Sequence, residues 1–235
     1  NSIGGVLARY EVEDSPSYVE FAMDYTGMRT FTTREAFAIM SSGKHAFGVA
    51  DGWISYGYDL YVGHYAKDDD PDTYDGVVDN MMLTPYVEYE SGSLCWMGSQ
   101  PLRFDARLGY VQSLQRDRAF ENEWKHPFGG ELFIRLSWYG LELSNRLYVG
   151  KGSLLSYYDR YGSAVYRGMP LYRTEKGLYD AIVLAYGQSF FNDTVSVKAG
   201  ITLENDGAVW GTRQWLQVSV NLDYGISLKR NKEIE

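Results

Sequence analysis

The side chains with the clearest chemical potential in this sequence are acids and bases that recur at alternate positions of regular polar and apolar segments. Rows of carboxylate and guanidinium groups can line a hydrated channel and set the field that a solute meets there. If these charges pair completely, the interior is plugged and structural. If some stay unpaired, ions and small polar solutes can pass. The residues expected to line such a lumen are Arg103, Asp105, Arg107, Glu131, Arg135, Glu142, Arg146 and Asp223.

A second group of residues with binding chemistry lies in a long segment rich in Tyr and Arg. Aromatic faces beside guanidinium groups can stack on sugars or hold a partner protein. The same segment could instead fold over a barrel mouth as a plug, and the sequence leaves both interpretations open. This possible binding surface comprises Tyr158, Arg160, Tyr161, Tyr166, Arg167, Tyr172 and Arg173.

Signals for hydrolytic catalysis are weak. Ser144-Asn145 is the fragment nearest to the Ser, His and Asn set of outer-membrane phospholipases, but no His lies two residues before Ser144. His126 is followed two residues later by Phe128 and not by Ser, so we expect a loop histidine there. The sequence therefore predicts no catalytic residue, with Ser144 as a strand residue that faces the lumen.

Metal-binding signals are equally weak. His45 and His64 are nineteen positions apart, without the spacing of a zinc site. An acidic loop contains Asp68, Asp70 and Asp72, and oxygen-rich loops can hold calcium. The spacing of an EF-hand and its distal Glu are absent, which favours a solvated loop. We expect no metal and no cofactor.

Long strands would have to position these charges. From Gln214 to Leu228 apolar and polar residues alternate without a break over fifteen positions, as in a strand with one apolar and one polar face. Soluble strands usually have about 5–6 residues, and roughly 9–11 cross a bilayer at a tilt. The pattern recurs along the chain. The sequence therefore predicts an all-β fold, an antiparallel transmembrane β-barrel of about 10–12 strands.

Connections between the expected strands fall into two classes. Because bacterial barrels have short periplasmic turns and long extracellular loops, we expect the same arrangement here. The expected turns are 14 to 16, 91 to 92, 139 to 140 and 192 to 193, and the expected long loops are 26 to 44, 67 to 79, 113 to 127, 150 to 177 and 205 to 213.

The turns also predict strand register. A two-residue turn at Tyr139-Gly140 sets Leu136 opposite Leu143, so that both strands place their apolar residues on one face. A turn at 192 to 193 similarly sets Tyr186 opposite Ala199. Two segments are less regular: 32 to 40 has the spacing of a short helix, and 45 to 66 fits either one very long strand or two strands that turn at 51 to 52.

Composition narrows the class of protein. The net charge of -9 and the pI near 4.9 argue against a phosphate-binding basic face, and so against nucleic acid as a partner. With Cys95 as the single cysteine, no intrachain disulfide can form. No apolar run approaches the roughly 18 residues of a membrane helix. The 21 Tyr, 6 Trp and 10 Phe are consistent with aromatic girdles at two membrane interfaces.

Several phrases of the sequence are distinctive. They are Gly27-Met28-Arg29-Thr30 with Arg34-Glu35-Ala36-Phe37, the segments 76 to 80 and 114 to 118, and Tyr158-Asp159-Arg160-Tyr161-Gly162 with 166 to 173. In these phrases the chain resembles a poorly characterised family of outer-membrane β-barrels of the Bacteroidota type. The resemblance implies the outer membrane of a Gram-negative bacterium, contact with its lipid, and additional strands before the region that matches Asn1.

The strand count bears on domain organisation. We expect one β-barrel domain over residues 1–235, which could be the C-terminal part of a larger barrel, because a count of eleven strands would point to an upstream segment. The expected function is a non-enzymatic, porin-like pore for small polar solutes, or a structural subunit of an envelope complex with other envelope proteins as partners. The alternatives are a barrel enzyme acting on lipid or glycan, and a soluble carbohydrate-binding β-protein.

Overall fold

The computed structural model describes residues 5–27, 36–65, 78–92, 95–97, 100–117, 123–151, 174, 176–191 and 194–220. The regular elements of this described part are all strands. The strands are β1 (Gly5–Glu11), β2 (Tyr18–Gly27), β3 (Ala36–Val49), β4 (Gly52–Tyr65), β5 (Val78–Ser91), β6 (Cys95–Met97), β7 (Gln100–Asp117), β8 (Phe128–Trp138), β9 (Leu141–Gly150), β10 (Leu178–Phe190), β11 (Val195–Asn205) and β12 (Trp210–Val220).

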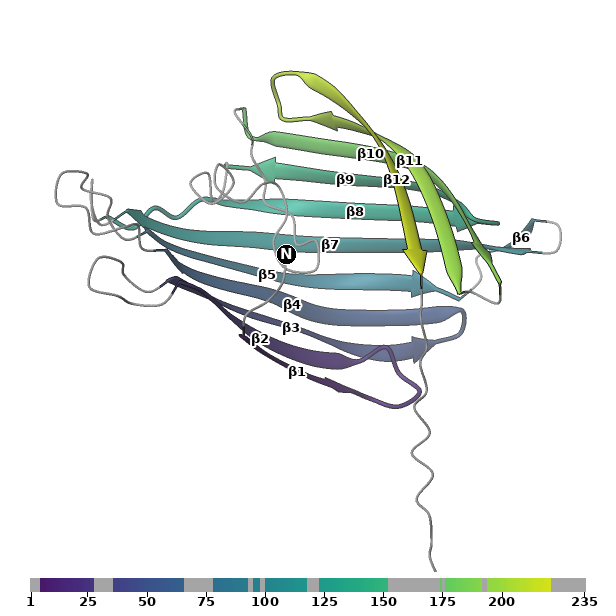
Figure 1. The fold of residues 1–235 in the computed structure, drawn as a ribbon, viewed down its shortest axis with the longest axis horizontal. Coiled ribbons are helices and arrows are strands. Elements are labelled where there is room, and N and C mark those ends of the chain that lie inside the picture. The colour runs from purple at the N-terminus through teal and green to yellow at the C-terminus, as the bar shows by residue number, and fades with distance from the viewer. Residues whose placement is uncertain are drawn as a thin grey trace, which may run out of the picture.

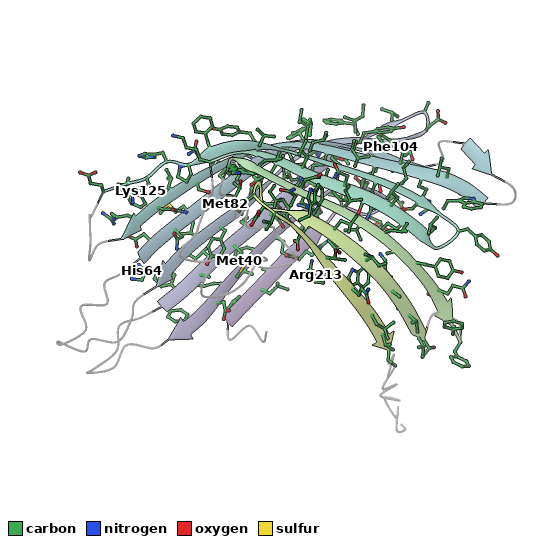
Figure 2. The ribbon with its side chains drawn as sticks, turned by 90° about the horizontal axis from the view of Figure 1, so that it is seen from above. Met40, His64, Met82, Phe104, Lys125 and Arg213 are labelled. Carbon is green, nitrogen blue, oxygen red and sulfur yellow. The ribbon has the colours of Figure 1, made fainter. Side chains whose placement is uncertain are left out.

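Eleven of these strands form one antiparallel sheet in chain order, from β1 at one edge to β12 at the other, and β6 adds a short hairpin to β7 (Figure 1). The predicted all-β antiparallel fold is confirmed. The sheet curves into an arch, but β1 and β12 do not pair with each other in the described residues, so the predicted closure is not seen (Figure 2).

The hairpin between β8 and β9 has the predicted register. Leu136 lies opposite Leu143, and Trp138 opposite Leu141. The turn between them has positive φ angles, 50° at Tyr139 and 81° at Gly140. Positive φ at both central residues defines a type I′ turn, whose twist matches that of the flanking strands. The register therefore follows from the turn and from the alternation together.

Two further register predictions are settled by the structure. Tyr186 lies opposite Ala199 in the β10 and β11 hairpin, as expected. The segment from 45 to 66 contains a turn, because β3 ends at Val49 and β4 begins at Gly52. Of the two alternatives for this segment, the pair of strands is the correct one.

The short helix predicted for 32 to 40 is wrong, because β3 runs from Ala36 and pairs with both β2 and β4. Ala38 and Met40 are buried while Ile39 is only half-buried, so the burial pattern has period two. Several predicted loops are also too long, including 67 to 79, since β5 begins at Val78. The strand β3 begins inside 26 to 44, β7 continues to Asp117 inside 113 to 127, and β12 begins at Trp210 inside 205 to 213.

The cross-strand register gives the sheet two distinct faces. Phe104 lies on the convex face, and Met40 and Arg213 lie within the arch on the concave face (Figure 2). The convex face is apolar and exposed, and the concave face carries buried, charged and small side chains. Exposed convex side chains include Tyr10, Val19, Phe21, Phe47, Ile54, Leu83, Val87, Leu108, Leu143, Leu184, Ile201 and Leu216. Buried concave side chains include Ala22, Met40, Ser55, Tyr61, Met82, Tyr86, Val111, Ser113, Glu131, Tyr148, Ala185 and Thr202.

Glycines on the concave face leave room for large neighbours. The ring of Tyr86 lies over its cross-strand partner Gly57, where a Cβ atom would come within 2.6 Å of the Tyr86 hydroxyl and 2.4 Å of a backbone oxygen. Trp215 covers Gly200 in the same way, with 2.5 Å to the nearest ring atom. Aromatic rings that cover strand glycines fix register and shield the backbone.

We predict that Gly57→Ala lowers the free energy of unfolding by about 1–3 kcal/mol, because the added methyl group must displace Tyr86 or the β3 backbone. Gly130→Ala is the matched control, since a Cβ atom there meets nothing closer than 3.8 Å. Urea unfolding followed by tryptophan fluorescence measures both. Equal stability of the two variants would contradict the packing described for Gly57.

Candidate functional site

The centre of the concave face is an ion cluster that spans four strands. Arg107 on β7 donates from Nη2 to Asp59 Oδ2 on β4 at 2.5 Å, and its Nε lies 3.0 Å from Glu131 Oε1 on β8. Its guanidinium carbon is 3.6 Å from the ring centroid of Tyr86 on β5. The arginine is therefore held by two carboxylates and one aromatic face.

Glu131 is the most enclosed acid of this cluster, with only 2 % of its side chain exposed. Arg146 on β9 approaches it from the other side, with 3.8 Å between Nη1 and Oε2. The cross-strand neighbour of Glu131 is Gly109, where a Cβ atom would lie 2.8 Å from Glu131 Cγ. The glycine therefore provides the space in which the carboxylate lies against the sheet between two guanidinium groups.

Further pairs extend this network toward both edges of the sheet. Three join residues on neighbouring strands, and three cross an intervening strand. The pairs are Arg9 with Glu20 at 3.2 Å, Lys44 with Glu88 at 3.1 Å and Glu90 at 2.9 Å, Arg135 with Asp105 at 2.7 Å, Lys198 with Glu142 at 2.9 Å, and Tyr179 with Glu204 at 2.7 Å.

Arg103 differs from the other concave-face arginines. It is exposed, and it makes no ion pair within the described part of the chain. It lines a recess of about 280 Å³ at the end of the sheet where β8 turns into β9. The polar side chains around this recess are Arg103, Ser137, Glu142 and Lys198, and Trp138, Tyr139, Gly140, Leu141 and Pro101 complete its wall.

Seven of the eight residues expected to line a lumen fall on the concave face, as their strand registers require. They are Arg103, Asp105, Arg107, Glu131, Arg135, Glu142 and Arg146. The eighth, Asp223, lies outside the described residues, as do the expected binding surface of 158 to 173 and the acidic loop with Asp68, Asp70 and Asp72.

Sequence reasoning missed important partners of these residues. Lys44 lies in a stretch that was expected to be loop, and Asp59 and Tyr86 reach Arg107 across strands whose order could not be known. A turn at 51 to 52 fixes which residues of β4 face the charged side of the sheet, and this signal could have identified Asp59 as one of them. Lys44 required recognition of the strand that begins at Ala36.

The residues considered for catalysis or metal binding are dispersed. Ser144 is buried on the concave face of β9, and His126 is exposed in the connection before β8. His45 and His64 both lie on the convex face, where His64 Nδ1 is 2.9 Å from Asp79 Oδ1 and Arg116 donates to the same carboxylate. Within the described ranges no group of three His, Cys, Asp or Glu residues is placed to hold a metal ion.

Comparison of the chain with family models, with curated proteins and with solved structures finds no match. The resemblance to outer-membrane barrels of the Bacteroidota type therefore stays a prediction.

We predict that Glu131→Gln lowers the free energy of unfolding by roughly 3–5 kcal/mol, because it removes the shared carboxylate of two guanidinium groups at a buried position. Glu142→Gln is the matched control. Its partner Lys198 is more exposed, so the loss should stay below about 1 kcal/mol. Urea titrations of both variants provide the measurement, and a larger loss in the Glu142 variant would refute the central position of Glu131.

Proposed function

We propose that this sheet is the wall of a transmembrane β-barrel in the outer membrane of a Gram-negative bacterium, acting without enzymatic chemistry as a pore for small polar solutes. The main observation in support of this proposal is the exposed apolar convex face, on which Leu108 is 59 % and Val87 54 % exposed. Contiguous apolar surface of this extent is rare on soluble monomers and marks an interaction surface. The described residues include no helix long and apolar enough to span a bilayer.

Aromatic side chains on the convex face support this proposal because most of them lie toward its two ends, with Phe21 and Tyr58 in between. Toward the end with the 139 to 140 turn lie Tyr10, Phe47, Tyr56, Tyr89, Phe104, Trp138 and Tyr186, and toward the other end lie Tyr25, Phe37, Tyr110, Phe128 and Trp210. In β3, Phe37 and Phe47 are ten residues apart, which is about 33 Å along the strand and about 25 Å in height at a tilt of roughly 40°. An apolar band about 25 Å tall between aromatic girdles is typical of outer-membrane barrels.

The aromatic group near the 139 to 140 turn, here called the first belt, supports such a tilt by its position within the strands. The row of cross-strand partners that contains Ala8 reaches Phe128 in β8. In β1, Tyr10 lies two residues beyond this row, and in β8, Trp138 lies ten residues beyond it. The first belt therefore shifts by eight residues over the six steps between neighbouring strands from β1 to β8. With a rise of about 3.3 Å per residue and a strand spacing of about 4.8 Å, this shift corresponds to a tilt of roughly 40°. A belt of constant height on tilted strands must shift in this way.

Connection lengths suggest the orientation. The β3 to β4 and β8 to β9 turns, at one end of the sheet, have two residues each, whereas the β9 to β10 connection at the other end covers 151 to 177. By the usual asymmetry, the short-turn end faces the periplasm and the other end the cell exterior.

Strand direction bears on closure. Because eleven strands alternate in direction, β1 and β12 both run toward the short-turn end. Two parallel edges cannot close an all-antiparallel barrel, so closure requires an odd number of further strands. The two edges without a partner among the described strands favour a second candidate function, a structural subunit that completes its barrel within an envelope assembly.

We predict that Leu108→Arg lowers the free energy of unfolding in lipid or detergent by about 2–4 kcal/mol, because it places a charge at mid-height of the apolar band. Val49→Arg, at the short-turn end of β3, is the matched control and should cost about 0–1 kcal/mol. On a soluble protein both exposed positions would tolerate Arg within about 0.5 kcal/mol. Urea titration in micelles measures the difference, and equal small effects would favour the soluble carbohydrate-binding alternative.

Reconstitution distinguishes the pore from the structural subunit. The full chain is expressed with a signal sequence in a Gram-negative host, and its presence in the outer-membrane fraction and heat-modifiable gel mobility are checked. In planar bilayers we expect discrete conductance steps, because polar side chains line the concave face. Insertion without conductance would favour the structural role, and recovery only in the soluble fraction would contradict both.

A further inference from the structure

We propose that the recess lined by Arg103 binds the anionic group of a small solute, a carboxylate or a phosphate. The inference deepens the proposed function, because it places a solute-binding position on the wall that would face the lumen. It concerns the short-turn end of the sheet, where Arg103, Ser137 and Glu142 occupy consecutive cross-strand positions on the concave face.

The chemistry of the recess is that of an anion site with one free guanidinium group. Arg103 is exposed and forms no ion pair within the described residues. Its neighbour Arg135 is neutralised by Asp105, at 2.7 Å from Nε to Oδ2. Asp105 is therefore paired with Arg135, and Arg103 lines the recess without a carboxylate partner among the described residues. A guanidinium fork matches a carboxylate or phosphate by two parallel hydrogen bonds.

A second cation reaches the same recess from β11. Lys198 lies opposite Gly187, and a Cβ atom at that glycine would be 3.2 Å from Lys198 Cγ. The missing side chain on β10 lets the lysine extend across the strand to Glu142, at 2.9 Å. Arg103, Lys198 and Glu142 together give the recess a net positive charge.

The surrounding wall has the same sign. Among the concave-face side chains that the structure describes, strands β1 to β5 carry two cations and six carboxylates, whereas β7 to β12 carry six cations and four carboxylates. The first group is Arg9, Lys44, Glu11, Glu20, Asp24, Asp59, Glu88 and Glu90, and the second is Arg103, Arg107, Arg135, Arg146, Lys198, Arg213, Asp105, Glu131, Glu142 and Glu204. The resulting field directs anions toward the part of the wall that holds the recess.

The size and walls of the recess limit the ligand. A volume of about 280 Å³ accommodates a small solute but no polymer. Ser137 can donate a hydroxyl hydrogen bond, and Trp138 and Tyr139 in the wall provide aromatic surface for the uncharged part of the solute.

The test is calorimetric titration of the refolded full chain in detergent with inorganic phosphate and, separately, with succinate, at constant ionic strength. We expect binding of at least one probe, and Arg103→Gln should weaken it at least tenfold. Arg213→Gln removes the same charge from the same face. Arg213 is 59 % exposed and is not among the residues that line the recess, so this change should alter the affinity less than twofold. Ser137→Leu, which fills the recess without altering charge, should also abolish binding.

The outcomes are separable from those of the proposed function. Binding in detergent does not require membrane insertion. A protein that inserts and conducts but binds neither probe would therefore contradict the anion site and leave the proposed pore intact. Equal weakening by Arg103→Gln and Arg213→Gln would also overturn it, since that result is expected for nonspecific charge. Native heat-modifiable mobility of each variant shows that a loss of binding is not a loss of fold.

Discussion

The fold depends on strict alternation along strands whose register is fixed. A slip of one residue in any ladder would exchange the two faces, placing Arg107 and Glu131 on the apolar side and Leu108 and Leu132 on the charged side. The type I′ turn at 139 to 140 and the glycines beneath large side chains prevent such a slip locally. The ion pairs prevent it across the sheet. Together they keep the apolar side chains on the exposed convex face.

Packing and electrostatics are combined on the concave face. Gly57 and Gly109 remove two side chains, and the vacated space holds the Tyr86 ring and the Glu131 carboxylate. Arg107 then lies between them, against one face of the ring and beside two acids. A buried charge is costly unless it is paired, and here each buried acid of the centre has a guanidinium partner. Among the seven concave-face residues predicted from sequence, Arg103 is the one without an ion pair within the described part of the chain. This free guanidinium group is the basis of the proposed anion site.

The sequence predicts much of this fold because alternation and turn chemistry are local signals. The registers of Leu136 with Leu143 and of Tyr186 with Ala199 follow from them and are confirmed. The strand from Ala36 was missed because small and polar residues interrupt its apolar row. Pairing partners of charges could not be predicted, since Lys44 and Glu90 are separated by 46 residues and Lys198 and Glu142 by 56. Such pairs depend on strand order and on glycines that let a lysine cross a strand.

The most direct test of the central claim is the environment of consecutive residues in β7. In a Cys95→Ser background, single cysteines at positions 105 to 110 carry nitroxide spin labels after reconstitution in liposomes. The account predicts a period of two, with Ala106, Leu108 and Tyr110 accessible to oxygen in the lipid, and Asp105, Arg107 and Gly109 accessible to a water-soluble nickel complex. The opposite phase, or nickel access at all six positions, would contradict it.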